Sequence, residues 1–319
     1  MSSGCTAILI LTFNSADDTM NCIRSIEACN SAPIKFIVVD NGSTAKGETD
    51  ILDRFFSQSG RTYHCWNDTD EAQEDLPFYS LIASRSNDGY ARGNNKGLHL
   101  ASRDSSIQNI LILNSDVLFT EDILPTLLRV KQEKPDCGLV TPLILSRRGT
   151  IDHCCARNAP TNWEIILPFL LFNRNRFQLL SKAEKRQKIL KMRPELLEQP
   201  IFPVDMPSGA CMLIDKDLFG ELGGFDPATF LYYEELILHK KLQAFSRTSY
   251  CVPSVKCTHL GARTTEHSPS RFLQRCNLES ADHYLSHYAH PTFSQRLVWS
   301  IVKGLWLLKF IITKTPHKG

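Results

Sequence analysis

The stretch IKFIVVDNGST, residues 34–44, joins a short apolar run to a polar turn. An unbroken apolar run such as residues 34–39 is typical of a parallel strand that is buried on both faces of a sheet. A second run of this kind, AILILT, occupies residues 7–12. Between the two runs, residues 18–29 carry apolar side chains near helical spacing, and aspartates near their start suit a helix N-terminus. Together these segments predict a βαβ unit.

The same alternation continues to about residue 113. Four further segments have the pattern of an element, namely a helix near Thr49–Phe56, a strand near Ser80–Ala83, a helix near Tyr90–Ala101 and a strand at Asn109–Leu113. This alternation predicts an α/β fold with a doubly wound, mainly parallel sheet. Because such sheets bind ligands beyond the carboxyl ends of their strands, the residues that follow each strand are the candidates for a site.

The second half of the chain is less regular. The pattern from about residue 154 to residue 203 predicts a helical insertion. Within it, residues 174–193 are strongly basic. Core-like sequence returns at Ala210–Ile214. The patterns after it predict helices near 217–222 and 234–245, short strands near 249–252 and 256–260, and two closing helices.

The composition excludes several broad classes of protein. With 42% hydrophobic and 22% charged residues, the chain of 319 residues is neither disordered nor a polytopic membrane protein. Thirty-six Lys and Arg against 34 Asp and Glu give a net charge of +2, so we expect no nucleic-acid partner. The 11 cysteines form no C-x-x-C pair, and we expect them to be reduced thiols.

The two ends of the chain bear on location. The N-terminal residues carry no positive charge before an apolar run that is too short for a signal peptide. Near the other end, Leu297–Ile312 is strongly apolar, but it is shorter than the roughly 20 residues that span a bilayer and contains Lys303 and Lys309. We therefore expect a cytoplasmic protein with an interfacial C-terminal helix.

Asp40 directly follows the strand expected at 34–39. A carboxylate at this place can accept hydrogen bonds from a ribose hydroxyl or from the N–H of a base. The sequence Asp-Asn-Gly-Ser is also a common turn, in which Gly42 allows the chain to reverse. The residues alone leave both interpretations open.

Asn114 and Asp116 directly follow the strand at 109–113. Two oxygen-bearing side chains at positions i and i+2 can hold Mg²⁺ or Mn²⁺ and leave coordination sites for a diphosphate. A helix cap is the other interpretation, but residues 120–122 are better placed to cap the helix expected near 122–134. Asp116 is thus free to bind a cation.

Residues 87–97, NDGYARGNNKG, have the glycine content of a phosphate-binding loop. They match neither the G-x-G-x-x-G fingerprint nor a P-loop, so neither a dinucleotide site nor a P-loop is supported. Arg92 can pair with a phosphate. A solvated helix start explains the same residues equally well.

Glu234 and Glu235 follow two tyrosines at the start of a predicted helix. Carboxylates are stabilised there by the helix macrodipole, which is a structural reason for the pair. Aromatic side chains packed against an acid also desolvate it and raise its pKa towards the range of a general base.

Seven motifs occur in one order along the chain. They are LTFNS (11–15), VVDNGST (38–44), N-x-G-Y-A-x-G-N-N (87–95), LNSD (113–116), SGA (208–210), GGFD-x5-YYEE (223–235) and THLG (258–261). This order resembles the inverting glycosyltransferases of family 2, above all the bacterial rhamnosyltransferase-like branch that builds O-antigen and capsule repeats. The resemblance covers residues of about 6–262 and implies the GT-A fold.

The resemblance also implies a role for each matched residue. Glu235 stands at the position of the catalytic base, and Asp116 and His259 stand at positions of metal ligands. Contacts with the nucleotide sugar are implied for a larger set, namely Asn14, Asp40, Asn87, Arg92, Asn95, Asn114, Asp116, Gly209 and Glu234. The implied reactants are a UDP- or dTDP-linked sugar and a saccharide acceptor carried by a polyprenyl diphosphate, with Mg²⁺ or Mn²⁺ as cofactor.

The same resemblance divides the chain. It implies a glycosyltransferase domain over 1–262, with a nucleotide-binding half of about 1–120 and an acceptor half of about 121–262 that carries the insertion. Residues 263–319 are expected to form membrane-associating helices on the inner face of the cell membrane. In these helices, Trp299 and Trp306 suit the headgroup level, and a set of cations suits anionic lipid, namely Arg296, Lys303, Lys309 and Lys314. Packing of the tail on the protein's own core is the alternative.

Three residues depart from the family pattern. The usual Glu-Asp pair is Glu-Glu, so Glu235 is one methylene longer, and because a misplacement of about 1 Å costs about a hundredfold in rate, the backbone must compensate. Ile237 replaces the next helical acid, and Asn114 replaces an acid at the metal position. A nucleotide-sugar-binding homologue with weakened catalysis is thus an alternative function. A nucleotidyltransferase is a more distant one, because residues 12–15 are not the basic, glycine-rich loop it needs.

Overall fold

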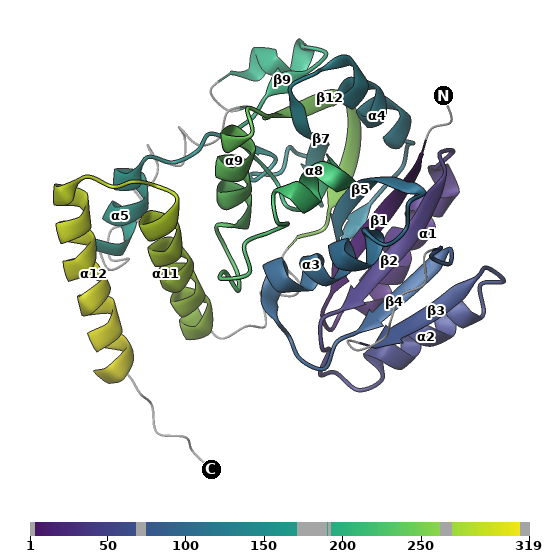
Figure 1. Cartoon of the computed structure of the whole chain (residues 1–319), viewed down its shortest axis with the longest axis horizontal. Coiled ribbons are helices and arrows are strands. Elements are labelled where there is room, and N and C mark those ends of the chain that lie inside the picture. Colours follow the sequence, from purple (N-terminus) through teal and green to yellow (C-terminus); the bar gives the residue numbers. More distant parts are fainter. Residues whose placement is uncertain (1–3, 68–74, 171–189, 191–192, 262–269, 313–319) are drawn as a thin grey trace.

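The computed structural model describes residues 4–67, 75–170, 190, 193–261 and 270–312. At its centre is a ten-stranded sheet with the strand order β3-β4-β2-β1-β5-β11-β7-β12-β6, with β9 beside β12. Helices cover both faces of the sheet (Figure 1). The predicted α/β class with a doubly wound, mainly parallel sheet is therefore confirmed.

The first half of the chain forms five parallel strands. They are β1 (Cys5–Thr12), β2 (Ile34–Asp40), β3 (Tyr63–Asn67), β4 (Tyr79–Ala83) and β5 (Ile107–Asn114). The connecting helices are α1 (Ala16–Cys29), α2 (Glu48–Ser57) and α3 (Gly89–Ala101). Alternate residues of β1 serve opposite faces, because Ile8 packs in the core that contains α1 and α2, and Leu9 packs in the core that contains α3.

The second half completes the sheet with mixed pairing. The elements are β6 (Val117–Leu118), α4 (Leu124–Glu133), β7 (Cys137–Ser146), β9 (Phe202–Pro203), β11 (Cys211–Asp215), α8 (Lys216–Glu221), α9 (Glu234–Ala244) and β12 (Thr248–His259). Strand β11 runs antiparallel between β5 and β7, and β7 is parallel to β12. The two strands expected near 249–252 and 256–260 are one strand, which shifts its register between Val252 and Lys256.

The insertion contributes a small sheet and a helix. Strand β8 (Ala156–Arg157) pairs with β10 (Met206–Pro207), and α5 (Asn162–Leu170) and the short helix η1 (Pro194–Glu198) lie between them in the sequence. Most of the basic stretch 174–193 lies outside the described residues.

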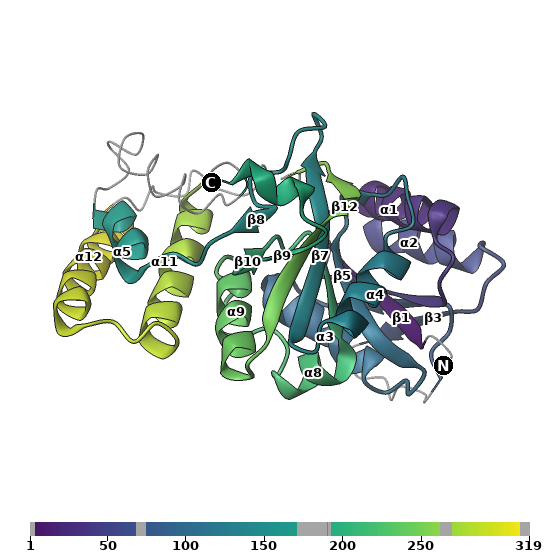
Figure 2. The same ribbon diagram turned by 90° about the horizontal axis from the view of Figure 1, so that it is seen from above.

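Helices α11 (Ser270–His287) and α12 (Phe293–Ile312) stand beside α5 at the end of the molecule opposite β3 (Figures 1 and 2). The three helices share a hydrophobic core with the start of α9, through Leu236 and Ile237. This core fixes the C-terminal helices to the part of the chain that carries the acid pair.

The expectation that both tail tryptophans reach lipid is wrong. Trp299 and Trp306 are only 6% and 4% exposed, and both rings pack edge-on against Phe169 of α5. Lys303 forms an ion pair within the protein, because its Nζ lies 2.6 Å from a carboxylate oxygen of Asp282. The tail helix is apolar on both sides, and a sequence that is apolar all round does not indicate which side faces the core.

The opposite side of α12 remains apolar and exposed. Its outward side chains recur every three or four residues, as Phe293, Leu297, Ile301, Leu305, Leu308 and Ile312. None of the described helices is long and apolar enough to cross a membrane. Lys314 lies outside the described residues.

Candidate active site

A cavity of about 520 Å³ lies where the carboxyl ends of β5 and β12 meet the N-terminus of α9. Five of the residues singled out in the sequence line it, namely Asn114, Gly209, Glu234, Glu235 and His259. Helix α5 contributes Ile165 and Phe169 to the wall, and α11 contributes Asn277. The described structure thus brings the acid pair and one residue from each metal-site motif, Asn114 and His259, to a single cavity.

Asp116 is not part of the cavity wall, but it lies beside His259, which is. The carboxylate oxygen Oδ1 of Asp116 is 3.3 Å from Nε2 of His259, and the amide nitrogen of Asn114 is 3.5 Å from the same ring nitrogen. Pairing of β6 with the end of β12, where His259 lies opposite Val117, holds the two motifs together. A carboxylate oxygen and an imidazole nitrogen that converge in this way are a donor set that fits a divalent cation.

His259 lies between two carboxylates. Its Nδ1 is 3.2 Å from Oδ2 of Asp152, and Asp116 lies on the Nε2 side. Burial alone would lower the pKa of His259, but Asp116 and Asp152 outweigh it and raise the pKa to about 10. Asp152 was missed in the sequence, because no matched motif includes it.

A strained backbone places the acid pair. Tyr232 and Tyr233 have φ angles of 76° and 71°, in the left-handed region that non-glycine residues seldom adopt. Each such residue costs about 1–3 kcal/mol unless its surroundings enforce it, and strain of this kind clusters at functional sites. The two left-handed residues end directly at Glu234 and Glu235, the first residues of α9.

Glu234 is the buried member of the pair. It is 5% exposed, and burial, together with the charge of Glu235, raises its pKa to about 8. Its Oε1 is buried and has no hydrogen-bond partner in the described part of the chain. The raised pKa favours the protonated form of Glu234, in which the carboxyl group can donate a hydrogen bond.

Glu235 is the more accessible member of the pair. Its Oε1 accepts a hydrogen bond from the Gly209 backbone N–H at 3.2 Å and lies 3.3 Å from Nη2 of Arg157. Its second oxygen has no hydrogen-bond partner within the described residues. These two contacts hold one oxygen of the longer carboxylate in place.

Gly209 and Arg157 come from separate parts of the chain. A Cβ at Gly209 would lie 3.0 Å from the Tyr90 hydroxyl and 3.2 Å from Glu235, so any larger residue here would crowd both side chains. Arg157 is the last residue of β8, and the pairing of β8 with β10 sets its position. No matched motif includes Arg157, and its role becomes visible only once β8 is placed beside α9.

The run 87–95 holds a loop rather than lining the cavity, whose wall includes only Tyr90 from this run. The side-chain amide of Asn95 donates to the Phe225 carbonyl at 2.8 Å and accepts from the Phe225 N–H at 2.9 Å. The guanidinium of Arg92 donates to the carbonyl of Pro227 at 2.8 Å. These contacts fix the GGFD loop that leads to the acid pair.

The first two motifs also make internal hydrogen bonds. Asp40 is 1% exposed and accepts from the Ser43 N–H at 3.0 Å and from the Thr49 hydroxyl. The side-chain oxygen of Asn14 accepts from the backbone N–H groups of Thr44 and Ala45 at 2.8 and 2.9 Å.

Asn87, in the third motif, also makes internal hydrogen bonds. Its Oδ1 accepts from Asn41 Nδ2 at 3.0 Å and from Gly89 N–H at 2.9 Å. The predicted nucleotide contacts of these side chains stay predictions, and the turn interpretation of residues 40–43 has direct support.

Two relatives of known function, both glycosyltransferases by name, match most of this chain. A 23% identical relative over 274 residues, 83% of this chain and 79% of its own length, is the N-acetylglucosaminyl-diphospho-decaprenol L-rhamnosyltransferase of Mycobacterium tuberculosis strain H37Rv. A second relative is the low-salt glycan biosynthesis hexosyltransferase Agl10 of Haloferax volcanii, 25% identical over 72% of this chain and 59% of its own length.

Two solved structures share the fold. GalNAc-T7 with UDP, GalNAc and Mn²⁺ matches with a TM-score of 0.60 and 14% identity, over 89% of this chain and 49% of that one. The mannosyltransferase PcManGT of Pyrobaculum calidifontis with GDP-Man and Mn²⁺ matches with a TM-score of 0.51 and 14% identity, over 97% of this chain and 76% of that one. Both are GT-A glycosyltransferases, which confirms the predicted fold type.

The family model for glycosyl transferase family 2 matches residues 7–183, more than half of the 319-residue chain. The matched region contains LNSD, strands β2 to β5 and all but the first two residues of β1. The chain therefore belongs to glycosyltransferase family 2 and is a glycosyltransferase.

Proposed function

We propose that the protein transfers a hexose, with inversion, from a UDP- or dTDP-linked sugar to a saccharide acceptor carried by a polyprenyl diphosphate. The observation that carries the proposal is the shared cavity, which has Glu235 on its wall together with His259, the neighbour of Asp116. Inverting transfer needs a base on the acceptor side and a positive charge at the leaving diphosphate. The cavity offers residues suited to both.

In this reaction, Glu235 removes the proton from the attacking hydroxyl of the acceptor. Its second carboxylate oxygen is available for that proton, because the first is held by Gly209 and Arg157. The acceptor oxygen then attacks the anomeric carbon from the side opposite the diphosphate, which inverts that centre. Glu234, whose raised pKa favours the protonated form, donates a hydrogen bond to the bound donor.

Asp116 and His259 would hold the divalent cation, with Asn114 beside them. When bound, the cation neutralises the charge that develops on the leaving diphosphate. Imidazole nitrogen is a better ligand for transition metals than for Mg²⁺, so we propose Mn²⁺ as the preferred ion. The Mn²⁺ in both structural neighbours supports this choice for a fold of this type.

The lipid-linked acceptor has support from the surface beside the cavity. Helix α5 lines the cavity with Ile165 and Phe169, while its Trp163 and Leu167 are 38% and 40% exposed. The outer side of α12 adds an exposed apolar stripe. We propose that this surface rests on the inner face of the cell membrane, where an acceptor with a polyprenyl tail is met. The decaprenol-linked acceptor in the name of the mycobacterial relative is consistent with this proposal, as is a role in surface polysaccharide synthesis.

A donor and acceptor screen tests the proposed function. Purified protein with MnCl₂ is incubated with UDP- and dTDP-sugars, with and without GlcNAc linked to a polyprenyl diphosphate, and the released nucleoside diphosphate and the anomeric configuration of the product are measured. We expect an inverted glycosidic product with one donor class. A donor that binds without any turnover would identify the weakened homologue instead, and the absence of binding by every donor would refute the proposal.

A further inference from the structure

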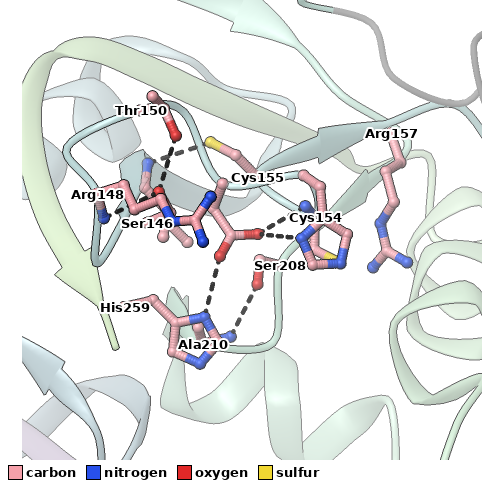
Figure 3. Close-up of polar contacts among 12 residues, drawn as sticks. Ser146, Arg148, Thr150, Cys154, Cys155, Arg157, Ser208, Ala210 and His259 are labelled. Atoms are coloured by element: carbon pink, nitrogen blue, oxygen red, sulfur yellow. Dashed lines mark hydrogen bonds and ion pairs between the residues drawn. The ribbon is translucent and has the colours of Figure 1, made fainter. Parts of the chain in front are cut away.

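Both carboxylate oxygens of Asp152 have partners within the described residues. It lies between β7 and β8, and its side chain is only 7% exposed. Its Oδ2 is 3.2 Å from His259 Nδ1, and its Oδ1 accepts from the backbone N–H of Cys154 at 2.7 Å. Figure 3 shows His259 and Cys154 on either side of this network. The carboxylate is thus fixed at one oxygen and presents the other to the histidine.

A carboxylate in this place determines how the imidazole is used. When a cation replaces the proton on Nε2, a hydrogen bond accepted from Nδ1–H keeps the remaining proton on Nδ1 and leaves the Nε2 lone pair for the cation. For His259 that other side is the carboxylate of Asp116, 3.3 Å from Nε2. Metal-binding histidines commonly have such a partner, and its loss typically lowers metal affinity 10–100-fold.

Among the described residues, Asp152 is the partner on the Nδ1 side of the ring, and Asp116 and Asn114 lie on the Nε2 side. The remaining polar contact of His259 is the amide of Asn114 at 3.5 Å, at the limit of a hydrogen bond. Without Asp152, the Nδ1 side of the ring would lose this contact.

A different use of the same segment has to be separated from this one. Ligand atoms of Asp152, His153 and Cys154 lie within 4.8 Å of one another, so these three residues could themselves hold an ion. However, both oxygens of Asp152 already have partners, and His153 is 74% exposed with its Nδ1 3.5 Å from Asp152.

We propose that Asp152 is a positioning residue that orients His259 towards the cation site formed with Asp116. The inference rests on the proposed function, because it takes Asp116 and His259 as the cation ligands. It adds a residue that precedes the insertion to a cation site whose other members come from the family motifs.

The test measures metal binding directly. MnCl₂ is titrated into the full-length protein in the presence of saturating UDP or dTDP, and the free ion is followed by electron paramagnetic resonance. We expect Asp152→Ala to weaken Mn²⁺ binding 10–100-fold and Asp152→Asn to weaken it less, because an amide oxygen can still accept from Nδ1–H. Thermal unfolding of each variant checks that it is folded, and Asp152→Asn serves if the alanine variant is not.

Neighbouring variants provide the matched controls. His153→Ala and Cys154→Ser should keep Mn²⁺ affinity within about twofold, because neither side chain orients His259 in the proposed arrangement. A loss in these controls as large as that of Asp152→Ala would assign the ion to the three consecutive residues and overturn the proposal.

Two further outcomes separate this inference from the proposed function. If Asp116→Ala abolishes Mn²⁺ binding while Asp152→Ala and Asp152→Asn leave it unchanged, the positioning role is wrong and the proposed cation site stands. If Asp116→Ala and His259→Ala both leave Mn²⁺ binding unchanged, the cation site itself is wrong, and the inference fails with it.

Discussion

The family pattern usually has aspartate at the position of Glu235. Replacing Glu235 with aspartate should nevertheless slow this enzyme. Glu235 Oε1 lies 3.2 Å from the Gly209 nitrogen and 3.3 Å from Arg157 Nη2. Both distances are near the upper end for a hydrogen bond, so neither contact can stretch further and survive. Aspartate would draw the carboxylate back by about one C–C bond, roughly 1.5 Å, and would lose both contacts.

The magnitude follows from that displacement. A catalytic group misplaced by about 1 Å loses about a hundredfold in rate. We therefore expect Glu235→Asp to lower kcat by about a hundredfold, which corresponds to about 2.7 kcal/mol of transition-state stabilisation. Donor affinity should stay near the wild-type value, because the change affects proton removal from the acceptor rather than donor binding.

The assay compares kcat at saturating donor and acceptor with the donor Kd from calorimetry. Glu235→Gln is the control, since its amide keeps the length of the side chain but cannot take a proton, and it should be less active than Glu235→Asp. An aspartate variant that works at the wild-type rate would refute the argument that Gly209 and Arg157 place the base. A glutamine variant with full activity would show that Glu235 is not the base.

Three further predictions concern the cation, the buried acid and the outer surface. Asp116→Ala should abolish transfer without lowering Tm, and full activity of this variant in EDTA would contradict the cation site. Glu234 has a pKa raised from 4.5 to about 8, so its contribution to stability is full below pH 4.5 and lost as the pH rises through about 8; Glu234→Gln should flatten the fall of Tm over this range. Ile301→Glu with Leu308→Glu, on the exposed side of α12, should release the protein from anionic liposomes at unchanged Tm, and continued cosedimentation would refute the membrane surface.

The sequence was most informative about the parallel half of the sheet. Runs such as residues 34–39 are buried on both faces, so their apolar pattern is nearly independent of what packs against them. Strand β7 was missed because its sequence, CGLVTPLILS, contains a glycine and a proline that normally interrupt strands. Strand β3 was missed because an edge strand with a half-exposed, mixed sequence has no clear period.

The candidate site likewise contains residues that the sequence could identify and residues that it could not. Asn114, His259 and the acid pair belong to recognisable motifs, and the fold brings them to one cavity. Arg157 and Asp152 lie near the start of the insertion, where no motif marks them, and their contacts depend on the placement of β8 and on the last residue of β12. A role that depends on tertiary pairing between distant segments leaves no local pattern to read.

The C-terminal helices take part in the same architecture, through the strained tyrosines that precede the acid pair. The left-handed conformations of Tyr232 and Tyr233 persist only where surrounding contacts enforce them. Helix α11 supplies such contacts, because Tyr284 packs on the ring of Tyr233 at 5.8 Å and the hydroxyl of Ser280 donates to the Leu231 carbonyl at 2.9 Å.

Helix α11 and the residue that follows it also hold the GGFD loop, where a carboxylate oxygen of Asp226 lies 2.8 Å from His283 Nε2 and accepts from the Tyr288 hydroxyl at 2.6 Å. Helix α12 in turn covers α5, which forms part of the cavity wall. A boundary at residue 262 would therefore cut between the acid pair and the contacts that keep its backbone strained. We propose that residues 270–312 belong to the catalytic unit: their inner surfaces hold the acid pair in position, and only the outer side of α12 is left to meet a membrane.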